Sequence, residues 1–323
     1  MIPPQASPYA SIIIPHWNGR HHLETCLMSL RHQTNQQFEL LLVDNGSHDG
    51  SQAYVREAFP EVRLLELGEN RGFTGACVAG YAAAVGEIII LLNNDTEAEP
   101  TWLAELLGGL ARHPQAGSAV GKILLFDQRD TFHTAGDFCQ LDGRPGNRGV
   151  WQKDVGQYDS EEYVFSGCGA AVAYRRTALE QVGFLDDTFF FSCEDVDLGW
   201  RLNLAGWRVV YVPTAVIYHK LKASSSPLSS YYDRRNLLYL LWKNYPTSLW
   251  RKHWRPIVRG QWHIFREAVG AWRGTAARAT LRGQLVGLLT GCRFWRTRRH
   301  IQTTRRLPDD QLTARLSPVD ESK

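Results

Sequence analysis

Carboxylates that can bind a nucleotide or a metal ion follow two apolar segments in the first 96 residues. Asp44 ends the run Leu41–Val43, and Asn94 and Asp95 follow the run Ile88–Leu92. Short runs of branched aliphatic residues between polar ones predict strands that are buried on both faces of a parallel sheet. Because such sheets bind ligands at the carboxyl ends of their strands, we expect both acids at one edge. Each acid alone is also compatible with a turn or a helix cap.

Two features of this region fit a nucleotide. A carboxylate such as Asp44 that faces the edge of a base favours a ring N–H, which uracil, thymine and guanine offer and cytosine lacks. The turn 68–76 places three glycines and Arg71 at the start of a helix that we predict to continue through Val85. The free N–H groups of a helix N-terminus and an Arg side chain bind diphosphates. Glycine-rich turns before helices are common, so this signal gains weight only beside the two acids.

The acidic segment 194–197 begins a helix that we predict over Ser192–Ala205, with Ser192 as its N-cap. The helix dipole stabilises acids in a first turn, which is a purely structural reason for them. The preceding Phe189–Phe191 offers an apolar surface that would raise the pKa of a carboxylate and make it a general base near neutral pH. Asp195 and Asp197 point about 200° apart on a helix, so we expect only one of them to face the site.

His219 lies just beyond a strand pattern at Val216–Tyr218. Most of the 11 histidines are expected on the surface or in the core. A hard divalent cation, however, can bind one carboxylate, one imidazole and the oxygens of a diphosphate. Asp95 and His219 are therefore a candidate pair of metal ligands.

The elements that must position these side chains alternate between strand and helix over residues 10–113 and are interrupted by loops over residues 114–230. Strand, helix, strand order with short connections predicts right-handed crossovers and a mainly parallel sheet with helices on both faces. Beyond Tyr231 the pattern is helical to about Arg299. The predicted strands are Ser11–Ile14, Glu39–Val43, Val62–Leu67, Ile88–Leu92, Cys168–Tyr174 and Trp207–Val212, the last closed by Pro213.

The composition is that of a globular protein, with 44% hydrophobic and 21% charged residues. The six cysteines are widely spaced, which argues against a zinc site or a disulfide framework and favours a reduced, cytosolic setting. Met1–Tyr9 shows no secretory signal, and no stretch has the roughly 18 apolar residues that a spanning helix needs.

Positive charge and tryptophan are concentrated near the C-terminus. Residues 251–306 hold 14 Lys and Arg residues and one acid, Glu267, and residues 239–299 hold six of the 11 tryptophans. Basic amphipathic helices with aromatic residues bind anionic membrane surfaces. The alternative is a helical packing face or a homodimer face, and the acidic excess of residues 1–250 disfavours nucleic acid.

Together these motifs resemble the family 2 glycosyltransferases of the GT-A fold, most closely the bacterial rhamnosyltransferase-like branch, over about residues 10–245. Each motif is unspecific alone, whereas all of them in this order are specific to the family. The motifs are Ile14–Asn18, Val43–Ser47, Asn70–Phe73, Leu92–Asp95, Gly167–Ala170, Glu194–Arg201, and His219 followed by Ser224.

The resemblance implies a GT-A domain over residues 1–230, with a nucleotide-binding half at about 10–113 and an acceptor half at 114–230. The basic helical region 231–306 and a flexible tail at 307–323 would follow. By resemblance, the nucleotide-sugar site is formed by Pro15, Asn18, Asp44, Arg71, Asn94 and Asp95.

The resemblance also implies roles for the remaining residues. Asp95 and His219 would hold Mg²⁺ or Mn²⁺ on the donor diphosphate, and Asp195 would deprotonate the acceptor hydroxyl. Support for the acceptor or donor would come from Glu194, Asp197, Trp200 and Arg201.

The chain departs from its relatives in two ways. Asn93 stands where many of them have the first Asp of an Asp-x-Asp pair, which leaves one less charge for a metal. The Gln-x-x-Arg-Trp motif of the processive synthases is not found, which favours transfer of a single sugar.

The implied function is the inverting, metal-dependent transfer of rhamnose or a similar sugar from a uridine or thymidine diphosphate donor. The acceptor would be a cell-surface glycan or lipid-linked precursor at the inner face of the cytoplasmic membrane. The alternatives are a non-catalytic nucleotide-sugar-binding protein and a sugar-nucleotide nucleotidyltransferase. The latter needs a glycine-rich loop with Arg or Lys directly after the first strand, which residues 15–20 do not supply.

Overall fold

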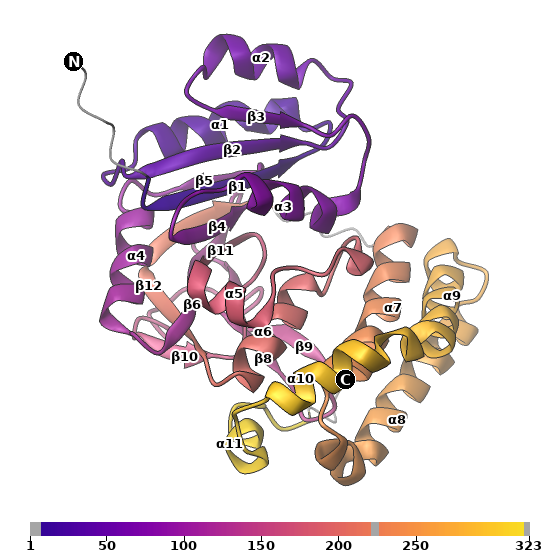
Figure 1. The fold of residues 1–323 in the computed structure, drawn as a ribbon. Coiled ribbons are helices and arrows are strands. Elements are labelled where there is room, and N and C mark those ends of the chain that lie inside the picture. The colour runs from indigo at the N-terminus through magenta and orange to yellow at the C-terminus, as the bar shows by residue number, and fades with distance from the viewer. Residues whose placement is uncertain (1–7, 221–225, 320–323) are drawn as a thin grey trace.

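A computed structural model describes residues 8–220 and 226–319 of the chain. Residues 1–7, which belong to the segment where we expected no secretory signal, lie outside these ranges, as does Ser224. The described residues form an α/β domain with a cluster of helices at one end (Figure 1). The predicted α/β class with a helical C-terminal region is confirmed.

A ten-stranded mixed sheet in the order β10-β12-β6-β11-β4-β1-β2-β3 forms the centre of the domain, with β5 paired to β12 and β7 to β6. The half formed by β3-β2-β1-β4 is entirely parallel, and β6 and β12 are also parallel. The strand β11 is antiparallel to both of its neighbours. The strands are β1 (Ala10–His16), β2 (Phe38–Asp44), β3 (Arg63–Glu66), β4 (Ile88–Leu92), β5 (Thr96–Ala98), β6 (Ala116–Leu125), β7 (Phe132–Thr134), β8 (Asp137–Cys139), β9 (Pro145–Asn147), β10 (Glu162–Val164), β11 (Ala171–Arg175) and β12 (Arg208–His219).

Helices cover both faces of this sheet, as the alternation of strand side chains requires. In β1, Ile12 and Ile14 pack into the core beneath α1, α2 and α4, whereas Ile13 packs into the core beneath α3, α5 and α6. The helices are α1 (Arg20–Arg31), α2 (Ser51–Ala58), α3 (Gly72–Ala83), α4 (Trp102–Arg112), α5 (Arg176–Val182), α6 (Glu194–Leu204), α7 (Pro227–Asn244), α8 (Thr247–Gly270), α9 (Thr275–Thr290), α10 (Trp295–Thr304) and α11 (Asp309–Thr313), with 3₁₀ turns η1 (Asp187–Phe189) and η2 (Gly291–Phe294).

The strand order reverses at β1, because the chain passes from β1 outward to β2 and β3 and then returns to β4 on the other side. In open parallel sheets, ligands bind outside the carboxyl ends of the strands at such a switch point. Asp44 is the last residue of β2, and Asn93–Asp95 follow the last residue of β4. The sheet therefore brings the predicted acids to one edge.

Two strands differ from the prediction. The strand predicted to close at Pro213 continues to His219, because a register shift between Val212 and Val216 lets the chain pass the proline and pair again with β6. The long strand β6 falls where we expected loops, because it begins with small residues and not with an aliphatic run. Its Gly121 is required by the irregularity in β12, since a Cβ there would lie 2.0 Å from the carbonyl oxygen of Ala215.

The helix that carries the acidic segment begins at Glu194, so the prediction of Ser192 as its N-cap is wrong. Ser192 and Cys193 both adopt left-handed backbone conformations, with φ of 71° and 65°. The hydroxyl of Ser192 instead donates to Asp233 of α7, at 2.5 Å. The capping signal failed because a contact with a distant helix uses the side chain.

The C-terminal helices share a second core with α6, separate from the sheet. Figure 1 shows α7 to α10 gathered at one end of the molecule, away from α2 and β3. Residues 307–319 do not form the free tail that we expected, because Leu312 is fully buried and the N–H of Ser317 donates to the carbonyl of Cys139. Within the described ranges, none of the helices combines the length and apolar character needed to cross a bilayer.

A buried ion network joins α6 to α7. Asp197 is fully buried and accepts hydrogen bonds from Arg201, Lys243 and Asn244. Burial alone would raise the pKa of Asp197, but the positive charges of Lys243 and Arg201 hold that pKa below its usual value. Lys243 also donates to Asp186 at 2.7 Å. One ammonium group therefore neutralises carboxylates from two segments.

Replacing the ammonium with a neutral side chain of similar length tests this network. Lys243→Met should lower the free energy of unfolding by about 3–5 kcal/mol, because it leaves Asp197 with one cation fewer in the interior. Urea unfolding of the full chain measures the change, with the exposed Lys252→Met on α8 as the matched control. A loss below about 1 kcal/mol would contradict the assigned role.

Candidate active site

A pocket of about 290 Å³ opens beside the carboxyl end of β4 and the start of α6. Its walls come from segments far apart in the chain, namely the end of β12, the strand β7, the β8–β9 hairpin and the loop before β11. Among the lining residues are Asn93, His133, Asp137, Gly169, Glu194, Asp195 and His219.

Asp195 is held in this pocket at the first turn of α6. Its Oδ2 accepts a hydrogen bond from the N–H of Gly169 and its Oδ1 accepts one from the N–H of Val196, both at 2.7 Å. Burial raises the pKa of Asp195, although these N–H groups partly offset the effect. The carboxylate is thus fixed in position and more basic than a carboxylate in water, which suits a general base.

Glu194 lies beside Asp195 and differs from it in protonation. Its side chain is buried, and its Oε2 has no hydrogen-bond partner among the described residues. Burial and, next, the charge of Asp195 raise the pKa of Glu194. Because the ionised Asp195 opposes a second charge, Asp195 loses its proton first and Glu194 keeps its own to higher pH.

The turn before α6 sets the direction in which these two acids point, and three of its residues have unfavourable backbone conformations. Phe190, Ser192 and Cys193 all have positive φ, a conformation that costs a non-glycine residue of order 1–3 kcal/mol. The side chain of Asn236, on α7, offsets this cost by donating to the carbonyls of Phe189, Phe191 and Ser192 at 2.7–3.0 Å. Gly72 is required below the turn, since a Cβ there would lie 2.4 Å from the carbonyl oxygen of Phe190.

Three of the predicted supporting residues lie away from the pocket. Asp197 points to the opposite side of α6 from Asp195, as the helical spacing predicts. Trp200 is buried between Phe165 and Tyr245, and the guanidinium of Arg201 donates to the carbonyls of residues 182–184. These side chains fix α6 in the fold and do not reach a ligand in the pocket.

Asp95 and His219 come together as predicted from their positions. The Oδ1 of Asp95 lies 3.1 Å from Nε2 of His219, yet it makes no hydrogen bond with a described residue. Asn93 also approaches the same ring nitrogen, at 3.3 Å. Burial would raise the pKa of Asp95, but the imidazole of His219 keeps it below its usual value.

The other ring nitrogen of His219 is occupied, because its Nδ1 lies 3.0 Å from Nδ1 of His133. Burial and the neighbouring His219 lower the pKa of His133 to about 3, so His133 is neutral near pH 7. A proton on Nε2 of His219 accounts for the lowered pKa of Asp95, and a cation that replaces this proton would face both Nε2 and the Oδ1 of Asp95. An imidazole nitrogen and a carboxylate oxygen that face one point fit a divalent cation such as Mn²⁺ or Mg²⁺.

A second group of ligand-type atoms, from Asp137, Cys168 and Asp195, lies within 4.8 Å. It fits a metal less well. Burial raises the pKa of the Cys168 thiol well above its usual value, and metals bind the thiolate. Asp137 already accepts hydrogen bonds from Thr134 and Asn147.

Several of the residues predicted to bind the nucleotide lie at the ends of β1 and β2. Asp44 is buried and accepts hydrogen bonds from the N–H of Ser47 and from Gln52. Asn18, in a left-handed conformation, exchanges hydrogen bonds with the same loop, since its N–H donates to Ser47 and its Oδ1 accepts from the N–H of His48. Pro15 lies beside Val43 in the paired strands.

Arg71 and Asn94 are two further residues of this predicted set. The side chain of Arg71 is half exposed and lies 3.3 Å from Glu69, while its N–H donates to Asn45. Asn94 is hydrogen-bonded to one ring nitrogen of His16, at 2.7 Å. The guanidinium of Arg71 is therefore accessible to an anion. The hydrogen bond between Asn94 and His16 joins the segment after β4 to the end of β1.

Four residues that shape the site were not predicted from the sequence. His16 and Asn45 connect the nucleotide-binding loops, and both stand inside motifs that we had singled out. His133 and Asp137 come from the β7–β8 region, where neither spacing nor neighbouring residues gave a signal. Only the pairing of β6 with β7 and the packing of β8 bring them to the pocket.

Comparison with protein families matches residues 11–183 to glycosyl transferase family 2. An N-acetylglucosaminyl-diphospho-decaprenol L-rhamnosyltransferase of Mycobacterium tuberculosis is 32% identical over 264 residues, which are 74% of this chain and 85% of that protein. The O-antigen biosynthesis protein RfbC of Myxococcus xanthus is 34% identical over 69% of this chain, although the match spans only 18% of RfbC.

Solved structures share the fold at lower identity. GalNAc-T7, crystallised with UDP, GalNAc and Mn²⁺, superposes with a TM-score of 0.59 at 16% identity, over 75% of this chain and 49% of that one. The mannosyltransferase PcManGT from Pyrobaculum calidifontis, in complex with GDP-Man and Mn²⁺, gives 0.53 at 18% identity over 92% and 85% of the two chains. The GT-A fold expected from the sequence is confirmed.

The buried Asp137 gives a pH-dependent test of the pocket. Burial and, next, Asp195 raise the pKa of Asp137 to about 7, whereas an aspartate in the unfolded chain has a pKa near 3.9. The folded state binds this proton more tightly, so the resulting stability is present below about pH 4 and is lost as the pH rises through 7. Asp137→Asn removes that loss and keeps the hydrogen-bond acceptor.

The variant should therefore gain on the order of 2 kcal/mol relative to wild type on going from pH 5 to pH 8. Urea unfolding at both pH values measures this difference, and the exposed Asp127→Asn serves as the control. An equal change in stability at the two pH values would show that Asp137 does not titrate in this range.

Proposed function

Because this chain belongs to glycosyl transferase family 2, we propose that it transfers a single sugar, rhamnose or a similar one, from a nucleoside diphosphate to a lipid-linked glycan precursor, with inversion at the anomeric carbon. One observation carries this proposal. The rigidly held carboxylate of Asp195 lines the same pocket as Asn93 and His219, which lie beside Asp95 at the end of β4. A proton acceptor and a diphosphate site thus face one space.

The names of the relatives support the choice of substrates. The mycobacterial relative is named for transfer of L-rhamnose to a diphospho-decaprenol carrier, and the solved neighbours contain UDP or GDP-mannose with Mn²⁺. In this chain the buried carboxylate of Asp44 favours a base with a ring N–H. This disfavours cytidine donors, and among the remaining bases we propose a uridine or thymidine diphosphate sugar as the donor.

In the proposed reaction, the donor lies with its base near Asp44 and its diphosphate near Arg71, Asp95 and His219. The diphosphate and Asp95 are both negative, so they need a cation between them. A bound Mg²⁺ or Mn²⁺, held by Asp95 and His219, would offset the charge that develops on the leaving diphosphate.

The residues of this chain supply the rest. Asp195 accepts the proton of the acceptor hydroxyl, whose oxygen forms a bond to the anomeric carbon. The bond from that carbon to the diphosphate oxygen breaks on the opposite face, and its electron pair leaves with the nucleoside diphosphate. The N–H groups of Gly169 and Val196 hold Asp195 in place. Glu194, which keeps its proton, adds no second charge beside it.

We further propose that the enzyme works at the inner face of the cytoplasmic membrane. Exposed tryptophans and arginines on α8 to α10 support contact with an anionic surface. A homodimer through the same helices is the competing use of this surface. Membership of family 2 removes the nucleotidyltransferase and the non-catalytic binder from consideration.

Asp195→Asn tests the base. The variant should lose transfer by roughly 10²–10⁴-fold, because it cannot accept the acceptor proton, yet should bind donor normally. Initial rates with a panel of uridine and thymidine diphosphate sugars measure transfer, and thermal stabilisation by the donor measures donor binding. The exposed Asp187→Asn is the control. A rate within twofold of wild type would rule out Asp195 as the base.

Chelation tests the metal. Excess EDTA should abolish transfer, and Mn²⁺ or Mg²⁺ should restore it. Stabilisation by uridine diphosphate alone, measured as a shift in Tm, should also require the added cation in wild type and should be weakened in His219→Ala. Full transfer and full stabilisation in EDTA would contradict the roles of Asp95 and His219.

A further inference from the structure

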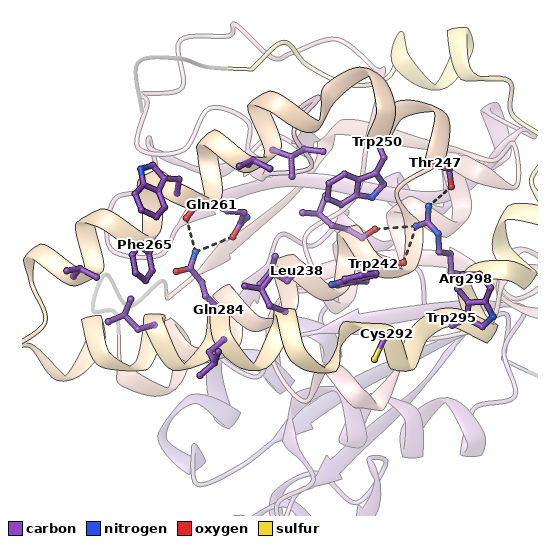
Figure 2. Close-up of a pocket in the computed structure, with 18 residues that line it drawn as sticks. Leu238, Trp242, Thr247, Trp250, Gln261, Phe265, Gln284, Cys292, Trp295 and Arg298 are labelled. Atoms are coloured by element: carbon purple, nitrogen blue, oxygen red, sulfur yellow. Dashed lines mark hydrogen bonds between the residues drawn. The ribbon is translucent and has the colours of Figure 1, made fainter.

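The C-terminal helices enclose an apolar groove that the proposed reaction does not use. It has a volume of about 1210 Å³, above the roughly 300–1,000 Å³ typical of sites for small molecules. Figure 2 shows its walls, with Phe265 and Gln261 on one side facing Gln284 and Leu238 on the other. The lining residues from α7, α8 and α9 include Leu238, Leu241, Trp242, Trp250, Ile257, Trp262, Phe265, Leu281, Leu285 and Leu288.

Three glycines spaced four apart create the groove by bringing α9 against α7. A Cβ on Gly283 would lie 2.4 Å from the carbonyl oxygen of Tyr231, and one on Gly287 would lie 2.8 Å from Leu238. A Cβ on Gly291 would meet the Trp242 ring at 2.0 Å. Because these glycines let α9 contact α7 closely, Leu281, Leu285 and Leu288 of α9 lie beside that contact and line the groove.

The few polar groups in the groove are directed at the protein itself. Gln284 donates to the carbonyl of Gln261 at 3.0 Å, and Arg298 donates to the carbonyl of Trp242 and to Thr247 at 3.1 and 3.0 Å (Figure 2). Little is left to recognise a polar ligand. Leu288 and Trp262 nevertheless remain 58% exposed, which is costly for side chains of this size. An apolar occupant is therefore favoured.

The helix α7 contacts both the groove and the turn before α6. The first turns of that helix hold the turn before α6, through Asn236 and Asp233, and its later turns supply Leu238, Leu241 and Trp242 to the groove. Phe190, beside the acidic pair, stacks on Tyr232 at 5.1 Å. An elongated ligand in the groove would thus extend along a helix that contacts the loop carrying the proposed base.

The helices that form the groove also carry exposed positive charge. This charge complements an anionic head group, whereas the groove itself complements an uncharged chain. Exposed basic residues on α8, on α9 and in the segment after α9 include Arg255, Arg266, Arg278, Arg282, Arg293 and Arg296.

We propose that this groove binds the polyprenyl chain of the lipid-linked acceptor. The inference rests on the proposed function, because it takes the acceptor to be a glycan diphosphate on such a lipid. Apolar lining, a volume suited to a long chain, exposed positive charge on the same helices and a helix shared with the active site all fit that single amphiphile. The groove positions the acceptor diphosphate near the pocket, so that the hydroxyl to be glycosylated can reach Asp195.

Two adjacent leucines provide a matched test. Leu288 lines the groove and is 58% exposed, whereas Leu289 is 68% exposed and is not among the lining residues. Leu288→Glu should weaken binding of decaprenyl phosphate in detergent at least tenfold, because it places a charge in the apolar groove, and Leu289→Glu should change it less than twofold. Tryptophan fluorescence gives the dissociation constants without any transfer, so a failure of the proposed activity would not affect this result.

A second pair of variants distinguishes a loss of lipid binding from a folding defect. Trp262 lines the groove, so Trp262→Glu should weaken binding as Leu288→Glu does. Trp272 is 59% exposed and lies outside the groove, so Trp272→Glu should have as little effect as Leu289→Glu. Unchanged binding of uridine diphosphate checks the fold of each variant.

Equal weakening by the groove and non-groove variants would overturn the proposal, since it would show a surface that inserts into a bilayer. No weakening by either groove variant would also overturn it. A dimer of the wild-type chain that Leu288→Glu dissociates, measured by light scattering, would show that a second copy fills the groove.

Discussion

The structure depends on the strained turn at Phe190–Cys193, which sets the direction in which α6 begins. Three of its residues adopt left-handed conformations without being glycine, and a buried amide, that of Asn236, compensates through three hydrogen bonds to its carbonyls. Because the turn places Glu194 and Asp195 at the start of α6, the geometry of the pocket is fixed by a side chain from α7. The C-terminal helices are thus part of the site's support and not an appendage.

Burial and neighbouring groups shift the pKa values of three carboxylates in this region, and the neighbouring groups differ from one carboxylate to the next. Asp197 is kept ionised by Lys243 and Arg201, and Asp95 by His219. Burial raises the pKa of Asp195, and its only partners, backbone N–H groups, offset that rise in part, so Asp195 is suited to accept a proton. Three acids in similar surroundings therefore differ in charge and partners, which suits Asp197 to stability and suits Asp95 and Asp195 to the roles that we propose toward a cation and toward the acceptor.

The sequence predicted the parallel half of the sheet because its strands are short aliphatic runs, and it predicted the edge where Asp44 and Asp95 lie. It missed β6, whose small residues pack against an irregular β12, since that requirement comes from tertiary packing. Ser192 shows the same limit, because a local capping pattern was overridden by Asp233, 41 residues away. His133 and Asp137 could not be predicted, as only the folded β7–β8 region brings them to the pocket.

The central claim is that the donor diphosphate lies at Asp95 and His219 while the acceptor approaches Asp195. A crystal structure with uridine diphosphate and Mn²⁺, with anomalous scattering used to locate the ion, tests it most directly. The account predicts one manganese peak coordinated by Asp95, His219 and the diphosphate, with the uracil beside Asp44 and Asp195 left free of metal. A peak between Asp137, Cys168 and Asp195, or a nucleotide bound away from Asp44, would contradict it.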